Sequence, residues 1–132
     1  MQHLRNDQPV ILPRLANLTG HKPIVVLVNG ETRSAAEILA GALRDTRGAR
    51  IVGEKTFGKG IVQSVWTFDD GTSMKVASAR YFIPSGKCIH QEGIHPNLEV
   101  ANSAVDHDRQ LVAALGLVGE SIVSPLHIAS RR

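Results

Sequence analysis

Hydrophobic residues follow different spacings along the chain, and each spacing predicts a different element. The run PIVVLV at residues 23–28 is continuously apolar, which predicts a β-strand buried on both faces. Residues 34–47 are rich in alanine and leucine, and their apolar positions recur with the period of a helix. From Ile61 the pattern changes to a period of two, which predicts a strand with two distinct faces. The pattern therefore predicts an α/β protein.

The predicted helix has recognisable signals at both of its ends. Ser34 is a favourable N-cap, and Glu37 follows three residues later, which together form a capping box. Gly48 ends the helix, and a second strand is predicted at 50–52. One apolar stripe along the helix is formed by Ile38, Leu39, Ala42 and Leu43. Strand, helix and strand form a βαβ-like unit with Ser34 at the carboxyl end of the first strand, the edge where open α/β sheets bind ligands.

The second half of the chain is predicted to begin with a β-hairpin. Asp69-Asp70-Gly71 is a turn signal between the strand that starts at Ile61 and a return strand at 73–83. A short strand is predicted at 98–100. A short helix capped by Asp106 is predicted to run to residue 115, with three inward-facing side chains, Leu111, Val112 and Leu115.

Composition excludes several classes of protein. Of the 132 residues, 42% are hydrophobic, which is ordinary for a globular domain and argues against disordered and membrane proteins. The net charge of +3 is weak and its signs are interspersed, so no nucleic-acid partner is predicted. A single cysteine, Cys88, excludes an intramolecular disulfide. No apolar run reaches the roughly 18 residues of a membrane span, and the first residues lack the apolar core of a signal peptide. No cofactor is predicted.

Ser34 has the surroundings of a candidate nucleophile. Its presence can be explained by helix capping alone. However, Ala35 and Ala36 after it are small enough to let a substrate approach, and a helix N-terminus offers N–H groups to an oxyanion. The turn from strand to helix is also the geometry of a nucleophile elbow, although the motif GxSxG is absent.

Lys59 is the candidate base for this serine. A lysine in a loop is usually a solvated charge, but Lys59 stands among apolar residues and glycines in FGKGIV. Burial disfavours the ammonium form, and a neutral lysine can accept the serine proton, as in Ser-Lys enzymes. If the next strand begins at the lysine, Lys59, Ile61 and Gln63 lie on one face, so that Gln63 can orient the amine. No pair of His and Asp suggests a triad instead.

Two other kinds of site are weaker predictions. Residues 53–59, GEKTFGK, fit GxxxxGK, but a phosphate-binding loop requires Ser or Thr next and then a helix, whereas Gly60 and a strand pattern follow. Four side chains are of types that bind zinc. Cys88, His90 and Glu92 alternate along a predicted strand, and His95 follows nearby. No paired ligand motif completes this set, so a surface strand is favoured and no metal site is predicted.

Several motifs, in order, resemble one family of proteases. VLVNGETRSAAEILAGALRD, IVGEKTFGKGIVQ and DGTSMKVASARYFIPSGKCIHQEGIHPNLEV are similar to the core of the carboxy-terminal processing, or tail-specific, serine proteases. The resemblance implies a partial ClpP/crotonase-like core, with a mixed sheet, helices and a β-hairpin. It implies that Ser34 is the nucleophile, Lys59 the base and Gln63 the residue that assists the lysine. It also implies an endopeptidase that cleaves proteins with apolar C-termini near those termini, in the periplasm or otherwise outside the cytoplasm.

The chain departs from the family pattern around and before the serine. Glu31 and Arg33 stand at the pocket edge, where the family's usual GSASASEI has small residues. Before this segment the family carries a signal peptide, a PDZ domain and a glycine-rich LRGNPGG-like loop. That loop supplies one N–H to the oxyanion, and the residue after the serine, here Ala35, supplies the other. With one donor missing, we expect the chain to be a fragment with impaired activity.

The resemblance also implies a division of the chain. We expect a lead-in at 1–22, the C-terminal part of the catalytic core at 23–103, and a short helix with a loose tail at 104–132, with PDZ domain and signal peptide absent. The strand at 24–28 is expected to have an unpaired edge, which favours pairing with a second copy or a partner chain. An alternative function is a catalytically incompetent remnant that binds peptides or proteins.

Overall fold

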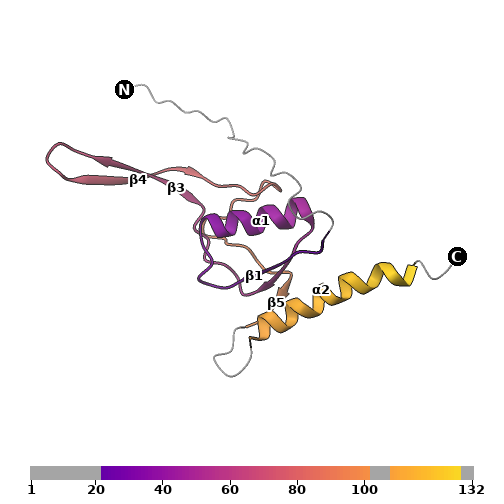
Figure 1. Ribbon diagram of the computed structural model, residues 1–132. Helices are drawn as coiled ribbons and strands as arrows, with labels where there is room; N and C mark the ends of the chain where they lie inside the picture. Colours follow the sequence, from indigo (N-terminus) through magenta and orange to yellow (C-terminus); the bar gives the residue numbers. More distant parts are fainter. Residues whose placement is uncertain (1–21, 102–107, 129–132) are drawn as a thin grey trace.

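The computed structural model describes residues 22–101 and 108–128, with side chains described to residue 120. Strand β1 (Val25–Val28), helix α1 (Ala35–Arg47) and strand β2 (Arg50–Gly53) form the predicted βαβ unit, and the two strands pair in parallel. Helix α1 lies on one side of this sheet (Figure 1). The expectation that the protein belongs to the α/β class is confirmed.

Burial in the parallel sheet is concentrated on its central strand. Strand β5 (Leu98–Glu99) pairs with β2, so the order of the described strands is β1-β2-β5. Ile51 and Val52 of β2 are completely buried, whereas Leu27 of β1 is 40% exposed. The prediction that β1 is buried on both faces is therefore wrong, because in the described sheet β1 is an edge strand and β2 has neighbours on both sides.

Helix α1 packs through small residues and one carboxylate. Its buried residues are Glu37, Ala40 and Gly41, whereas Leu39 is 52% exposed. A Cβ added at Gly41 would lie 2.4 Å from Cγ2 of Ile83, so the helix approaches this neighbour too closely for any side chain. The predicted apolar stripe is therefore only partly buried: Ile38 packs against the core, whereas Leu39 is exposed. The most deeply buried face is formed by the small residues, where the helix packs closely. Gly48 ends the helix, as predicted, and the structure shows that its backbone is left-handed.

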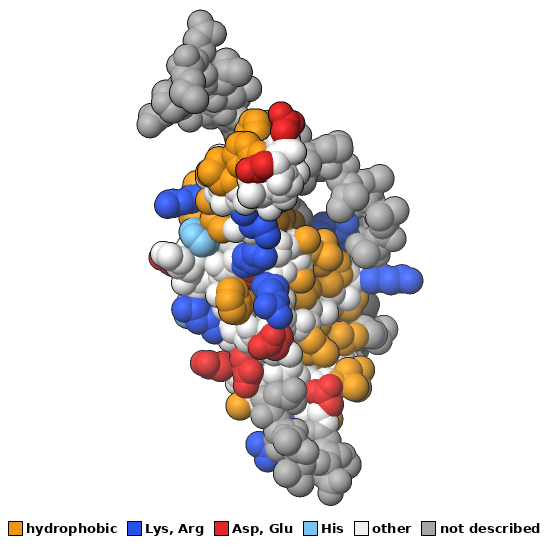
Figure 2. Space-filling view, turned by 90° about the vertical axis from the view of Figure 1, so that its left-hand side faces the viewer, with side chains coloured by type: hydrophobic (Ala, Val, Ile, Leu, Met, Phe, Trp, Pro, Cys, Tyr) orange, Lys and Arg blue, Asp and Glu red, His pale blue; other side chains and the backbone are white. Residues whose placement is uncertain are grey.

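The β-hairpin forms a sheet of its own. Strands β3 (Ile61–Thr67) and β4 (Ser73–Arg80) are antiparallel, and they extend away from the parallel sheet (Figure 1). The hairpin confirms the predicted turn, but within the described part of the chain it does not join β1, β2 and β5 into the mixed sheet that was expected. All of β4 is exposed. Viewed from the hairpin end, hydrophobic side chains occupy much of the surface beside a column of lysine and arginine side chains (Figure 2).

Helix α2 (Arg109–Ile128) differs from its prediction in length and orientation. It continues well past residue 115, and the N–H of Leu111 donates to the side chain of Asp108 at 3.0 Å, which caps the helix. The predicted cap, Asp106, lies outside the described residues. The side chains that were expected to face inward are exposed: Leu111, Val112 and Leu115. Gln110 and Ala114 are buried instead, because α2 contacts β1 and β2 through a narrow face.

The end of α1 is tied to the turn that follows the hairpin. Asp45 accepts hydrogen bonds from the backbone of Ser85 at 2.9 Å and from Nε of Arg44 at 3.1 Å. Burial raises the pKa of Asp45, but these hydrogen bonds and the Arg44 charge outweigh burial and hold the pKa below its ordinary value.

No helix within residues 22–101 and 108–128 combines the length and the apolar character needed to cross a membrane.

Candidate active site

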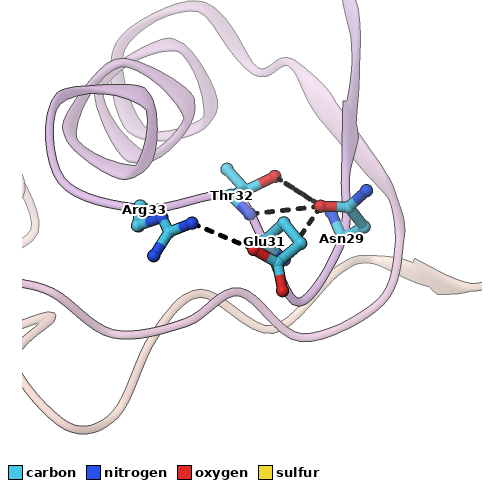
Figure 3. Close-up of polar contacts among 4 residues, drawn as sticks. All are labelled: Asn29, Glu31, Thr32 and Arg33. Carbon is cyan, nitrogen blue, oxygen red and sulfur yellow. Dashed lines mark hydrogen bonds and ion pairs between the residues drawn. The ribbon is translucent and has the colours of Figure 1, made fainter.

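The turn between β1 and α1 is fixed by hydrogen bonds within it. The side-chain oxygen of Asn29 accepts the N–H of Glu31 at 3.0 Å and the N–H of Thr32 at 3.1 Å (Figure 3). The hydroxyl of Thr32 accepts the N–H of Asn29 at 3.0 Å. Such Asx-type bonding holds a turn in one conformation. The turn delivers the chain to Ser34 at the carboxyl end of β1, as the sequence predicts.

Ser34 has a backbone conformation that non-glycine residues rarely adopt. Its φ is 57° and its ψ is −122°. A Cβ in this region costs about 1 to 3 kcal/mol, and the conformation persists only where the surrounding structure imposes it. A nucleophile elbow has the same kind of strain on its serine. The strain therefore supports a role for Ser34 beyond capping, because an ordinary N-cap residue has an unstrained β-region backbone.

We expect Ser34→Gly to be more stable than Ser34→Ala by about 1 to 2 kcal/mol in the free energy of unfolding. Both variants lack the hydroxyl, but only alanine retains the Cβ that the positive φ disfavours. Urea unfolding followed by circular dichroism measures the difference. An alanine variant as stable as the glycine variant would show that the serine backbone is unstrained in solution.

The carboxylate of Glu37 joins the start of α1 to the loop that contains Lys59. This side chain is completely buried. Its Oε2 accepts the backbone N–H of Ser34 at 2.9 Å and the backbone N–H of Lys59 at 2.8 Å. Ser34 and Lys59 are thus held next to each other by one oxygen atom, although 25 positions separate them in the sequence.

The second oxygen of Glu37 holds the residues before the lysine. Oε1 accepts the N–H of Gly58 at 2.7 Å and the hydroxyl of Thr56. The hydroxyl of Thr56 in turn accepts the N–H of Ile94 at 2.7 Å. Each carboxylate oxygen therefore accepts two hydrogen bonds, and the buried charge is compensated by donors on all sides.

The glycines that flank Lys59 are required by close packing. Gly58 has a φ of 88°, and its carbonyl accepts the N–H of Gln91 at 2.8 Å. A Cβ added at Gly60 would lie 2.6 Å from the backbone nitrogen of His90. The loop is therefore fixed between Glu37 on one side and residues 89–93 on the other, which sets the position of the Lys59 backbone.

The side chain of Lys59 does not have the surroundings that the sequence predicts. The apolar neighbours in FGKGIV predict a buried amine, but Lys59 is exposed. The prediction of burial is wrong for the described structure, because the loop buries the backbone of Gly58 and Gly60 and leaves the lysine between them on the surface.

The other two predicted site residues follow Ser34 and Lys59 along the chain, Ala35 at the start of α1 and Gln63 on β3. Ala35 is exposed at the first turn of α1, where N–H groups have no partner within the helix. Gln63 is exposed on β3, at the point where the pairing register with β4 shifts. Such a bulge re-aims the side chains beside it. β3 begins at Ile61, so the regular alternation expected from Lys59 onward starts two residues later.

Sequence reasoning missed the central role of Glu37 and a contact of Arg33. The sequence identifies Glu37 as half of a capping box, and this half is formed. Its bonds to Thr56, Gly58 and Lys59 have no signal in the local sequence, because these donors come from a loop across the sheet edge. The guanidinium of Arg33 lies 5.6 Å from the ring centre of Phe57, a contact that joins the same two segments.

The two weaker site predictions have little structural support. The loop 53–59 leads into strand β3 and not into the helix that a phosphate-binding loop requires. Across the described ranges of the chain, no three His, Cys, Asp or Glu side chains are close enough together to hold a metal ion. Glu92 and His95 are exposed in the segment that follows the bridge between Phe82 and Cys88.

Comparisons with known proteins point to one family. A model described as "Peptidase family S41" matches residues 3–100. The carboxyl-terminal-processing protease of Synechocystis sp. is 45% identical over an alignment of 104 residues, which covers 74% of this chain and 24% of that protein. The carboxy-terminal processing protease CtpA of Bacillus subtilis is 46% identical over 78 residues, 59% of this chain and 17% of that protein.

A solved structure agrees with these relatives. The photosystem II D1 C-terminal processing protease is 47% identical to the chain, with a TM-score of 0.57 over 60% of this chain and 20% of that one. The chain thus spans about a fifth of the length of the proteins that it resembles.

Proposed function

Because the chain belongs to peptidase family S41, we propose that it is part of a serine endopeptidase that processes proteins near their C-termini, with Ser34 and Lys59 as its catalytic dyad. The single observation that carries this proposal is the Oε2 atom of Glu37, which binds the backbone N–H groups of both residues at 2.9 and 2.8 Å. A nucleophile and its base must be held within hydrogen-bond reach of each other, and this shared acceptor fixes their backbones side by side.

In the proposed reaction, Oγ of Ser34 attacks the carbonyl carbon of the scissile peptide bond. The neutral amine of Lys59 takes the hydroxyl proton and later transfers it to the leaving amine. The N–H of Ala35 donates to the oxyanion of the tetrahedral intermediate. Departure of the protonated amine leaves an acyl-enzyme ester on Ser34, which water then attacks while Lys59 takes a proton from that water. The bond between the acyl carbon and Oγ breaks, Lys59 returns the proton to Oγ, and the substrate leaves with a new C-terminal carboxyl group. Gln63 orients the amine of Lys59.

Lys59 is exposed, whereas its proposed role as a base requires an amine that is shielded from water. A general base must be neutral to accept a proton, and removal from water favours a neutral amine, so we expect the amine of Lys59 to be shielded from water in the reacting complex. A polypeptide bound over Ser34 would cover Lys59 and favour the neutral amine. We therefore expect the dyad to become competent only when a substrate, or another part of a longer protein, lies over the exposed loop.

The remaining parts of the proposal follow from the resemblance to whole proteases. We expect a substrate protein with an apolar C-terminus, a ClpP/crotonase-like core and a location outside the cytoplasm. In the sheet of described strands, β1 has a neighbour on one side only, so we expect its other edge to pair with a strand of a second copy or of another part of a longer protein. Among the described residues we identify one oxyanion donor, Ala35. Because the chain spans about a fifth of the length of its relatives, we expect it to be a poor protease by itself. The loss of one oxyanion donor lowers the turnover of a serine protease about 100- to 1000-fold.

A chimera tests the proposal independently of the activity of the short chain. The 78 residues that match Bacillus subtilis CtpA replace their counterpart in that protein, and the chimera is incubated with an unstructured protein that has an apolar C-terminus. We expect cleavage near that terminus by the chimera, none by its Ser34→Ala variant, and a rate for the isolated chain at least about 100-fold lower. A folded chimera without activity, or one that is as active with alanine at position 34, would contradict the proposal and favour a binding module.

A further inference from the structure

Arg33 and Phe57 lie where the two catalytic segments meet. Arg33 directly precedes Ser34, and Phe57 is two residues before Lys59. The backbone N–H of Phe57 donates to the carbonyl of Thr32 at 3.0 Å, so the two segments are joined beside this pair as well as through Glu37. Any group bound by Arg33 and Phe57 is therefore held next to the proposed dyad.

The pair presents a cation and an aromatic ring to solvent. The Arg33 guanidinium lies 5.6 Å from the centre of the Phe57 ring, and its Nη2 is 3.0 Å from Oε2 of Glu31 (Figure 3). The side chain of Arg33 is 53% exposed, and Phe57 is 58% exposed. An exposed large aromatic residue stacked by an arginine offers both an apolar surface and a positive charge to a ligand.

The guanidinium has unused hydrogen-bonding capacity. It carries five N–H donors in a planar fork, which matches a carboxylate bidentately. Its ion pair with Glu31 is exposed, and such pairs contribute little, so an incoming carboxylate can replace Glu31. The Asx-type turn fixes the backbone just before Arg33, and the Phe57 ring contacts the guanidinium itself. This prior ordering reduces the entropy lost on binding.

We propose that Arg33 and Phe57 form a subsite that binds a carboxylate of the polypeptide substrate next to the scissile bond. The carboxylate is either the α-carboxylate at the substrate C-terminus or an acidic side chain, and the apolar part of the same substrate residue packs on the Phe57 ring. This inference rests on the proposed function, because a polypeptide is taken to be the ligand. When the subsite is empty, Glu31 pairs with the guanidinium of Arg33, so that this cation is not left without a partner.

Peptide binding to the full 132-residue chain tests the subsite. The chain carries Ser34→Ala, so that no peptide is consumed, and three N-acetylated hexapeptides of alanine and leucine are titrated into the ¹⁵N-labelled protein. The first has a free C-terminal carboxylate, the second a C-terminal amide, and the third an amide with one internal glutamate. Chemical shifts of the Arg33 Nε–H and of the Phe57 amide give each Kd.

We expect at least one carboxylate peptide to bind about five-fold more tightly than the neutral peptide. The comparison of the first and third peptides identifies the source of the carboxylate. The preference should disappear in Arg33→Gln and decrease in 0.5 M salt, because it is electrostatic. It should persist in Arg50→Gln, the matched control, since Arg50 is exposed at the amino end of β2, opposite Val25 and away from the turn after β1.

Equal affinities for the three peptides, no binding at millimolar concentration, or an unchanged preference in Arg33→Gln would each overturn the subsite. The outcome is separable from that of the proposed function. Serine-dependent cleavage by the chimera without any carboxylate preference would refute the subsite alone. A carboxylate preference lost in Arg33→Gln, together with a folded but inactive chimera, would refute the protease and leave a peptide-binding surface.

Discussion

Replacing Glu37 by glutamine is expected to lower the free energy of unfolding by about 3 kcal/mol. The carboxylate accepts four hydrogen bonds, two on each oxygen. An amide keeps one acceptor oxygen and replaces the other by a donor, so two N–H or O–H groups lose their partner and face an N–H₂ group. For a small domain, whose total stability is about 5 to 15 kcal/mol, this is a large fraction.

The same substitution should separate the two proposed catalytic segments. The bonds to Thr56 and Gly58 are buried, while those to Ser34 and Lys59 are partly buried. We therefore expect the amide oxygen to stay with Thr56 and Gly58, and the amides of Ser34 and Lys59 to be released towards water. Hydrogen exchange should then accelerate at Ser34 and Lys59 more than at Gly58.

Urea unfolding of the 132-residue chain measures the loss of stability, and Glu31→Gln is the matched control. Glu31 carries the same carboxylate three residues before Ser34, but its side chain is 81% exposed. Its replacement should change stability by no more than about 0.5 kcal/mol. If Glu37→Gln unfolded at the same urea concentration as the unsubstituted chain, the buried carboxylate would not hold the loop as the structure indicates.

Replacing Lys59 by arginine in the chimera is expected to reduce turnover about 100- to 10,000-fold, the range that a positioned acid–base group contributes. A guanidinium stays protonated near neutral pH and cannot accept the proton of Ser34. Stability should be nearly unchanged, because Lys59 is exposed and its backbone N–H, which Glu37 binds, is retained. The loss should therefore appear in kcat.

Two further variants show whether the loss of turnover is specific to Lys59. Lys55→Arg is the matched control, since Lys55 is an exposed lysine of the same loop, and it should leave turnover unchanged. Gln63→Ala should reduce turnover less than Lys59→Arg, because it disturbs the orientation of the base and leaves the base in place. Cleavage at a near-normal rate by the Lys59→Arg chimera would rule out the dyad.

Local sequence signals were sufficient for the elements that depend on neighbouring residues. The capping box at Ser34, the left-handed Gly48 and the Asp-Asp-Gly turn each depend on residues within one turn of chain, and the structure confirms the helix end and the hairpin at these positions. The motif resemblance likewise identified the family, because several motifs recur in order along a contiguous stretch.

Burial, in contrast, was predicted poorly wherever it depended on partners that are distant in the sequence. The apolar residues of β1, the apolar stripe of α1 that includes Leu39, and the side of α2 that includes Leu111 were all predicted to be buried. Each of these three sets contains exposed side chains. The side chains that are buried are those that face a neighbouring strand, helix or loop in the folded protein. Strand β2 is covered because it is central, and α1 packs through Gly41 because Ile83 lies against it.

The sequence alone determined the order of the elements, the family and the residue types available for chemistry at Ser34, Lys59 and Gln63. Only the tertiary structure decided that Ser34 is strained, that Lys59 is exposed, and that Glu37 binds both of their backbones. The reason is physical. Capping and turn preferences arise from atoms a few residues apart, as in the bond between Ser34 and Glu37. The other three donors to Glu37 reach it only when a loop 19 to 22 residues further along the chain closes over the start of α1.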